Sequence, residues 1–204
     1  PTAAPTAAPT ATPTTAPTAA PTPVPTLHLA PTPAPTQASA VGDPHLVNVH
    51  GQRFDLMQPG NHTMLWIPRG ASPSATLLGV VARAEHIGKA CSDMYIVALT
   101  IKGQWIAGVP GARRLGDAWD MQYFASKPAQ RGSRGAGWNT YGNIRMKVNW
   151  GHTAEGVKYI NLLVRNLANS GYTVGGLLGE DDHTSASTPM ADCQQFLSLL
   201  GWSR

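Results

Sequence analysis

A proline recurs at every fourth position across residues 1–26, and a threonine follows each of these prolines. Proline lacks a backbone N–H and fixes its own φ, so this tract can form neither a helix nor a strand ladder and favours extended polyproline II conformation. Residues 1–40 also contain no Asp, Glu, Lys or Arg and few side chains that a core could bury. We therefore expect a stalk or linker over residues 1–40 and one folded domain over residues 41–204.

Two roles remain open for the Pro/Thr tract. As a spacer, it would carry O-linked glycans on the threonines that follow the prolines, and these glycans would stiffen it. As a linker, it would be disordered and would supply only length. The candidate acceptors are Thr2, Thr6, Thr10, Thr14, Thr18, Thr22 and Thr26.

The charge and hydropathy of the chain argue against two classes of partner. Fifteen Lys and Arg against eleven Asp and Glu give a net charge of only +4 over 204 residues. The basic residues are not interleaved with aromatic residues in the way that single-strand binding requires. No apolar run approaches the ~18 residues that a membrane-spanning helix needs. We therefore expect neither a nucleic-acid partner nor a membrane span.

Strand-type runs recur at short spacing after residue 41, separated by Gly, Pro, Asn and Asp. Gly42-Asp43-Pro44 predicts a turn, which leads into a strand over residues 45–50 and, after Gly51, a second short strand around Phe54. One helix is expected over residues 189–200, with Thr188 as its cap. Further strands are expected over residues 62–68, 76–87, 94–101, 104–107, 119–125, 143–150, 157–166 and 172–174. This pattern predicts a mainly β fold, an antiparallel β-sandwich with a short C-terminal helix.

Two motifs carry a resemblance to a known family. Gly42-Asp43-Pro44-His45, followed by a short strand, a glycine turn and Phe54-Asp55, resembles the opening of von Willebrand factor type D domains. The Gly-Gly-Leu-Leu-Gly-Glu-Asp-Asp sequence at residues 175–182 resembles the late Gly-Leu-x-Gly motif of the same family. The resemblance covers residues 41–204 and implies a secreted or cell-surface building block. Its expected partners are other extracellular or matrix proteins, including copies of itself in a filament.

The Asp43–Pro44 bond is a candidate processing site. An Asp-Pro bond is labile because the carboxylate can attack its own carbonyl while the basic proline nitrogen leaves. The resemblance implies self-cleavage here, with Asp43 as the attacking group and His45 as a proton shuttle. The alternative is an intact structural turn.

Glu180, Asp181 and Asp182 supply the clustered oxygen ligands that calcium prefers. The resemblance implies a calcium site at this loop together with an Asp in the first hairpin, but His50 stands at that hairpin position. The alternative is an acidic turn capped by its own side chains.

Cys91 and Cys193 are the only cysteines in the chain. A zinc site would need further ligands at ordered spacing, so we expect a single disulfide between the terminal helix and the sheet. Such a bond would indicate an oxidising compartment, whereas two buried free thiols remain the alternative. Family members usually contain many more cysteines, so the chain departs from the family here.

Other residues are candidates for glycan chemistry. Asn61-His62-Thr63 is an N-glycosylation sequon, expected in a loop. The loop over residues 126–137 carries Lys127, Arg131 and Arg134, which could hold an anionic glycan or form a solvated hairpin tip. Four tryptophans are expected in the core, with a sugar-stacking platform as the alternative role. They are Trp66, Trp105, Trp119 and Trp150.

No placement of Ser, His, Asp or Cys selects a catalytic set, so we expect a protein that is not an enzyme. The function expected is extracellular assembly or adhesion by a domain on a glycosylated stalk. A self-processing domain and a glycan-binding module are the alternatives.

Overall fold

The computed structural model describes residues 37–87, 93–127 and 137–190. The chain divides into two units, Pro1–Thr32 and Pro33–Arg204, and all described residues lie in the second. Residues 1–36 of the expected stalk, with all of its candidate glycan acceptors, therefore lie outside the described residues. No helix in the described part is both long enough and apolar enough to cross a membrane.

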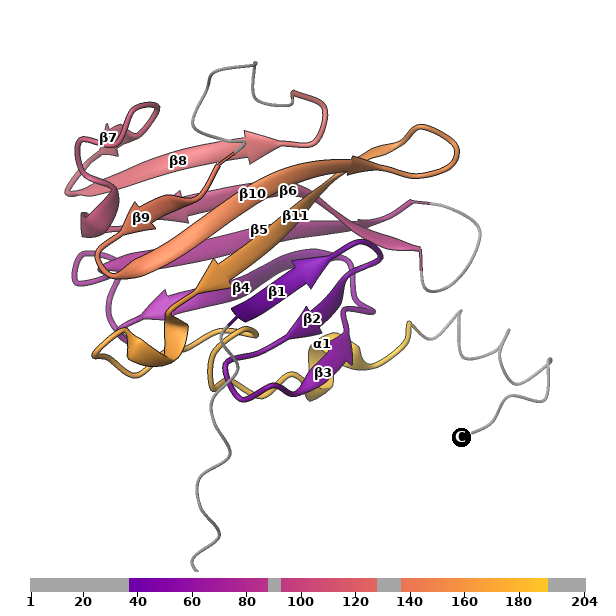
Figure 1. The fold of residues 1–204 in the computed structure, drawn as a ribbon, viewed down its shortest axis with the longest axis horizontal. Helices are drawn as coiled ribbons and strands as arrows, with labels where there is room; N and C mark the ends of the chain where they lie inside the picture. Colours follow the sequence, from indigo (N-terminus) through magenta and orange to yellow (C-terminus); the bar gives the residue numbers. More distant parts are fainter. Residues whose placement is uncertain (1–36, 88–92, 128–136, 191–204) are drawn as a thin grey trace, which may run out of the picture. The chain divides into compact units, whose positions relative to one another are not determined.

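Two antiparallel sheets form the domain, as the strand pattern predicted, and they lie as two layers in Figure 1. The six-stranded sheet has the order β3-β2-β1-β11-β10-β9, with β1 (Gln37–Val41), β2 (His45–Val47), β3 (Arg53–Asp55), β9 (Asn139–Tyr141), β10 (Ile144–His152) and β11 (Lys158–Arg165). The five-stranded sheet has the order β4-β5-β6-β8-β7, with β4 (Gly60–Ile67), β5 (Leu78–His86), β6 (Met94–Lys102), β7 (Arg113–Leu115) and β8 (Ala118–Phe124). The fold is a β-sandwich.

The core lies between the two sheets, where alternate side chains of each strand point inward. On β10 and β11 the even-numbered positions from Ile144 to Val148 and from Ile160 to Val164 are buried, while their neighbours face outward. The facing sheet contributes buried apolar residues from β5 and β6, and β11 contacts β6 across the interface. This period-two pattern is the one expected of strands with one face on a core.

The sheet begins four residues before the expected domain boundary. Strand β1 lies between β2 and β11, pairing Gln37–Ala40 with Leu162–Arg165 and Ser39–Val41 with His45–Val47. Ala38 and Ala40 point into the core and are buried. The strand is hard to recognise in the sequence because alanine is depleted in strands and the preceding composition is Pro/Thr-rich.

Several expected elements differ from the observed ones. Residues 104–107, expected as a strand, form a 3-10 helix at Gln104–Ile106, which follows Gly103 with a φ of 125°. Residues 172–174 form no strand, although Gly175 makes an isolated bridge with Trp66. The short strands β7 and β9 were not predicted, because three residues are too few to establish a period.

The short helix near the C-terminus is α1 (Thr184–Ser187). The helix expected over residues 189–200 lies almost entirely outside the described residues.

Candidate functional site at the Gly-Asp-Pro-His hairpin

The turn between β1 and β2 presents the Asp43–Pro44 bond at the tip of a hairpin. Val41 pairs with His45 across the hairpin, which leaves Gly42, Asp43 and Pro44 as the connecting residues. Gly42 has a φ of 72°, a left-handed conformation that favours glycine, and its N–H donates to Asn161 Oδ1 of β11 over 2.7 Å. The hairpin tip is thereby held to the sheet.

The Asp43 carboxylate points toward the start of β6, where its Oδ1 accepts a hydrogen bond from the Met94 N–H over 3.1 Å. Burial raises the pKa of Asp43 above its ordinary value. The Met94 hydrogen bond and the charge of His45 oppose this rise, while the carboxylates of Asp93 and Asp55 add to it. Partial burial therefore keeps a proton on Asp43 at a higher pH than in an unfolded chain.

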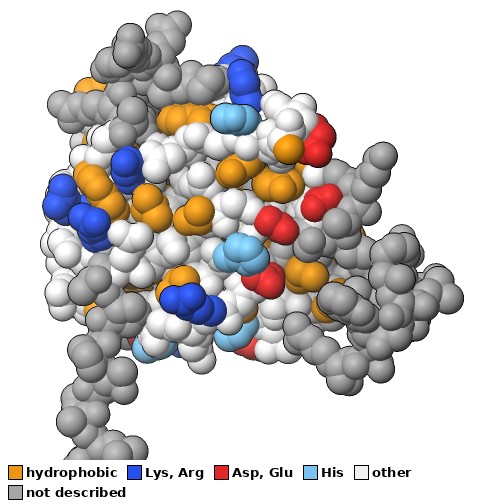
Figure 2. Space-filling model, turned by 45° about the vertical axis from the view of Figure 1, so that its right-hand side comes forward, with side chains coloured by type: hydrophobic (Ala, Val, Ile, Leu, Met, Phe, Trp, Pro, Cys, Tyr) orange, Lys and Arg blue, Asp and Glu red, His pale blue; other side chains and the backbone are white. Residues whose placement is uncertain are grey.

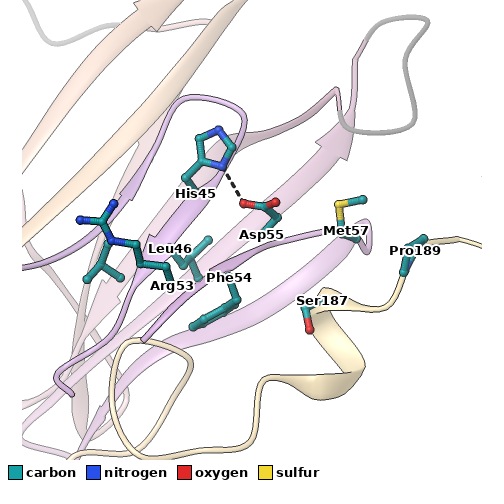
Figure 3. A pocket seen from close by; sticks show the side chains of 9 residues that line it. His45, Leu46, Arg53, Phe54, Asp55, Met57, Ser187 and Pro189 are labelled. Atoms are coloured by element: carbon teal, nitrogen blue, oxygen red, sulfur yellow. Dashed lines mark hydrogen bonds and ion pairs between the residues drawn. The ribbon is translucent and has the colours of Figure 1, made fainter. Parts of the chain in front are cut away.

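His45 and Asp55 form a pair on the neighbouring strands β2 and β3. Their Nδ1 and Oδ1 atoms are 2.6 Å apart, and Figure 3 shows the two side chains facing one another. This contact fixes the orientation of the imidazole ring, which leaves its Nε2 available to exchange a proton.

A pocket of about 470 Å³ lies beside the His45–Asp55 pair. Strands β2 and β3 form its floor, and Met57, Ser187 and Pro189 complete its wall (Figure 3). Next to it, the Phe54 ring stacks on His183, with 4.0 Å between the ring centres. The His45–Asp55 pair therefore lies at the wall of a pocket.

The strand that starts at His45 is shorter than predicted because Asn48 ends it. The buried Asn48 Oδ1 accepts hydrogen bonds from the N–H groups of His50 and Gln52, each over 3.0 Å. Its side-chain amide also donates to Gln52 Oε1 over 2.6 Å. Such asparagine-centred turns are recognisable in principle from the Asn-x-His-Gly sequence, which the strand prediction overlooked.

The two motifs that carry the family resemblance lie side by side. The Val49 N–H donates to the Leu178 carbonyl over 2.8 Å, and the Leu178 N–H donates to the Met64 carbonyl over 2.9 Å. Gly176 has a φ of 89°, and a Cβ atom there would lie 2.6 Å from the Met64 backbone. The glycines of the late motif therefore allow its backbone to approach β4 closely enough to bond to it.

Each of the three carboxylates proposed for calcium has a partner within the protein, and two of them share Arg69. Asp181 accepts a hydrogen bond from the Gly176 N–H over 2.5 Å and forms an ion pair with Arg69, whose Nε lies 2.8 Å from Asp181 Oδ1. Glu180 lies 3.7 Å from Arg69 Nη1. Asp182 Oδ1 accepts from the N–H and hydroxyl of Thr184 over 2.9 and 2.6 Å, and these bonds lower the pKa of Asp182.

In the part of the chain that the structure describes, no group of three or more His, Cys, Asp or Glu could hold a metal ion. The calcium site at Glu180, Asp181 and Asp182 stays a prediction. Sequence reasoning missed Arg69, because nothing in the sequence links this residue of the β4–β5 loop to a turn more than a hundred positions later.

The remaining candidate residues are dispersed. Cys91 and Cys193 lie outside the described residues, as do Arg131 and Arg134. Asn61 lies in strand β4, paired with Arg83, rather than in a loop, but it is exposed. Trp105, Trp119 and Trp150 pack at the margin of the core, whereas Trp66 is half-buried with Lys102 Nζ 4.6 Å from its ring centre. These four tryptophans come from four separate elements: β4, the 3-10 helix, β8 and β10.

Comparison with models of known protein families gave no match, and comparison with curated proteins gave no significant match.

Proposed function

We propose that this chain is a structural or adhesive module of the von Willebrand type D kind, which works outside the cell and is carried on a glycosylated Pro/Thr stalk. One observation carries the proposal. The segment that begins with Gly-Asp-Pro-His, residues 42–55, and the late glycine motif are far apart in the sequence, yet a hydrogen bond of 2.8 Å joins Val49, in the turn between β2 and β3, to Leu178. The two motifs that resemble one family are therefore also in contact with each other. Such contact is expected if both motifs belong to one domain of that type.

The intact mass of the protein from its native source, before and after reduction, tests this proposal. Extra mass in hexose or pentose steps on residues 1–40 is expected, because the threonines are the glycan acceptors. A gain of two hydrogens on reduction is expected from a Cys91–Cys193 disulfide. An unmodified mass with both thiols free would contradict the extracellular location.

Self-processing at Asp43–Pro44 is a second candidate function, and the raised pKa of Asp43 is the observation that favours it. In the reaction, the protonated carboxyl group of Asp43 attacks the carbonyl carbon of the same residue through one oxygen and forms a cyclic anhydride. The C–N bond to Pro44 breaks, and the carboxyl proton of Asp43 passes to the proline nitrogen, with His45 as the shuttle. Water then opens the anhydride, which leaves a new Asp43 carboxyl end.

Incubation of the purified chain between pH 4 and pH 7, followed by mass spectrometry, tests the second candidate. Fragments that end at Asp43 and begin at Pro44 should accumulate faster as pH falls, because the protonated form of Asp43 supplies the proton. The Asp43→Asn variant should remain intact. Wild-type protein that stays uncut across this range, or cleavage that persists in the variant, would exclude this reaction.

A further inference from the structure

The outward face of the six-stranded sheet carries a basic surface. Strand alternation directs Arg145 and Lys147 of β10, Arg165 of β11 and Arg53 of β3 to this side, opposite the core. We call these four residues the basic face. The one carboxylate that β1–β3 and β9–β11 place on this side, Asp55, is paired with His45. Figure 2 shows Lys and Arg side chains gathered at the left of the view among exposed hydrophobic side chains, with the acidic side chains mainly to the right.

Arg145 and Arg165 are directly opposite each other in the β10–β11 register. Like charges at such a position destabilise a sheet. Both guanidinium groups lie near the ring of Trp138, with Cζ atoms 5.6 and 4.2 Å from its centre. These cation–π contacts fix the two side chains in place without neutralising them. Neither arginine has an acidic partner among the described residues.

The basic face is broad and contains polar groups. One row of paired positions runs across five strands through Lys147, Leu163, Ser39, Val47 and Arg53. With strands ~4.8 Å apart, the cations at its two ends are about 19 Å apart. Asn149 and Asn161 form the next row beside Val41, which is 38% exposed. Cations therefore surround amide, hydroxyl and small apolar side chains.

We propose that the basic face binds an anionic polysaccharide that carries sulfate or carboxylate groups. The unneutralised Arg145–Arg165 pair supplies charge complementarity, and fixed guanidinium groups match the planar oxyanions of such a polymer. The amide and hydroxyl side chains between the cations can bond sugar hydroxyls, and Val41 and Leu163 can contact ring carbons. A nucleic acid is a poorer match, because the one tryptophan on this face already packs against both arginines.

This inference deepens the proposed function by naming a class of partner. It rests on that function only for the location, outside the cell, at which the chain would meet the polysaccharide. Binding is measured on the purified full chain, with immobilised dextran sulfate as the probe and unsulfated dextran as the uncharged reference. Binding to the sulfated polymer alone is expected at about 0.15 M salt, and it should weaken as salt increases. The double variant R145Q/R165Q should lose about tenfold in affinity or more.

The matched control is R113Q/R114Q, which removes the same charge from β7 of the other sheet. It should leave binding unchanged, whereas R53Q/K147Q should weaken binding without touching Trp138. The melting temperature of R145Q/R165Q should stay close to that of the wild type, because the removed repulsion offsets the lost stacking.

Four results would overturn the inference: no binding of dextran sulfate, equal losses in R113Q/R114Q, binding that persists in R145Q/R165Q, or tighter binding of double-stranded DNA or polyglutamate. None of these results depends on export or on glycosylation of the stalk. The binding assay can therefore contradict the inference about the basic face while the mass measurement supports the proposed function, and the reverse is equally possible.

Discussion

At the scale of single residues, Gly176 combines a left-handed backbone conformation with a close approach to β4 at the junction of the two motifs. Its φ is 89°, and an added Cβ atom would lie 2.6 Å from the carbonyl carbon and oxygen of Met64. Gly176→Ala should therefore lower the free energy of unfolding by about 2–4 kcal/mol, because strain and overlap add. Urea unfolding followed by tryptophan fluorescence measures this loss.

Gly171 provides the matched control for Gly176. Its φ is 79°, but nothing lies within 4 Å of the position of an added Cβ atom. Gly171→Ala should cost about 1 kcal/mol, which is the strain of the left-handed conformation alone. Equal losses in the two variants would mean that the close approach between Gly176 and β4 does not matter for stability.

The raised pKa of Asp43 predicts a pH dependence of stability. A carboxyl group whose pKa is higher in the folded state stabilises the fold at pH values below its unfolded pKa, and this contribution disappears as pH rises through the folded pKa. Asp43→Asn retains an oxygen for the Met94 N–H but carries no charge. The variant should be at least as stable as the wild type at pH 7, and its advantage should vanish toward pH 3.5. Thermal unfolding across this range measures the difference, and a variant that is less stable at pH 7 would contradict the assignment.

At the scale of elements, the sequence pattern predicted the long strands, and of the short ones only β2 and β3, which flank a glycine turn, were expected while β1, β7 and β9 were missed. Strands β4, β5, β6, β8, β10 and β11 have seven to nine residues, enough for an apolar alternation to be recognised. Residues 104–107 were wrongly predicted as a strand. The apolar Trp105 and Ile106 suggested an extended segment, whereas Gly103 donates its N–H to the Trp119 carbonyl and starts a single turn of helix. That contact is tertiary, so the local sequence does not encode it.

The candidate site shows the same division. The Asp43–Pro44 turn was predictable because proline and glycine fix local geometry. The partners of the candidate residues were not predictable from the sequence. Met94, Asp55 and Arg69 contact those residues only because strand register and loop placement bring them there. Arg145 and Arg165 likewise become a pair only because β10 and β11 align them.

Strand β1 tests the position of the domain boundary. Ala40 is completely buried, whereas its neighbour Ser39 faces outward on the same strand. Ala40→Asp places an unpaired charge in the core and should destabilise the domain by more than ~3 kcal/mol, or prevent folding. Ser39→Asp should change stability by less than about 0.5 kcal/mol. Circular dichroism and thermal unfolding compare the pair, and tolerance of both substitutions would place β1 outside the folded domain.

At the scale of the whole described domain, the β1–β2 hairpin has the Asp43–Pro44 bond at its tip while β1 remains paired on both sides. Four residues of β1 pair with β11 and three with β2. A break at the tip therefore removes no strand pairing and leaves Ala38 and Ala40 in the core. We expect that residues 1–43 stay bound to residues 44–204 after the bond is broken. Cleavage would then cut the chain without releasing its N-terminal segment.

Co-expression of the two fragments, with an affinity tag on residues 44–204 only, measures this directly and needs no self-cleavage. Residues 1–43 should co-purify in native buffer and separate in urea, because burial of one strand rather than a covalent bond would hold them. Introducing Ala40→Asp into the short fragment should abolish co-purification, whereas Ser39→Asp should preserve it. If the wild-type fragments separate without denaturant, strand pairing alone is too weak to hold residues 1–43. Cleavage at Asp43–Pro44 would then release this segment from the domain.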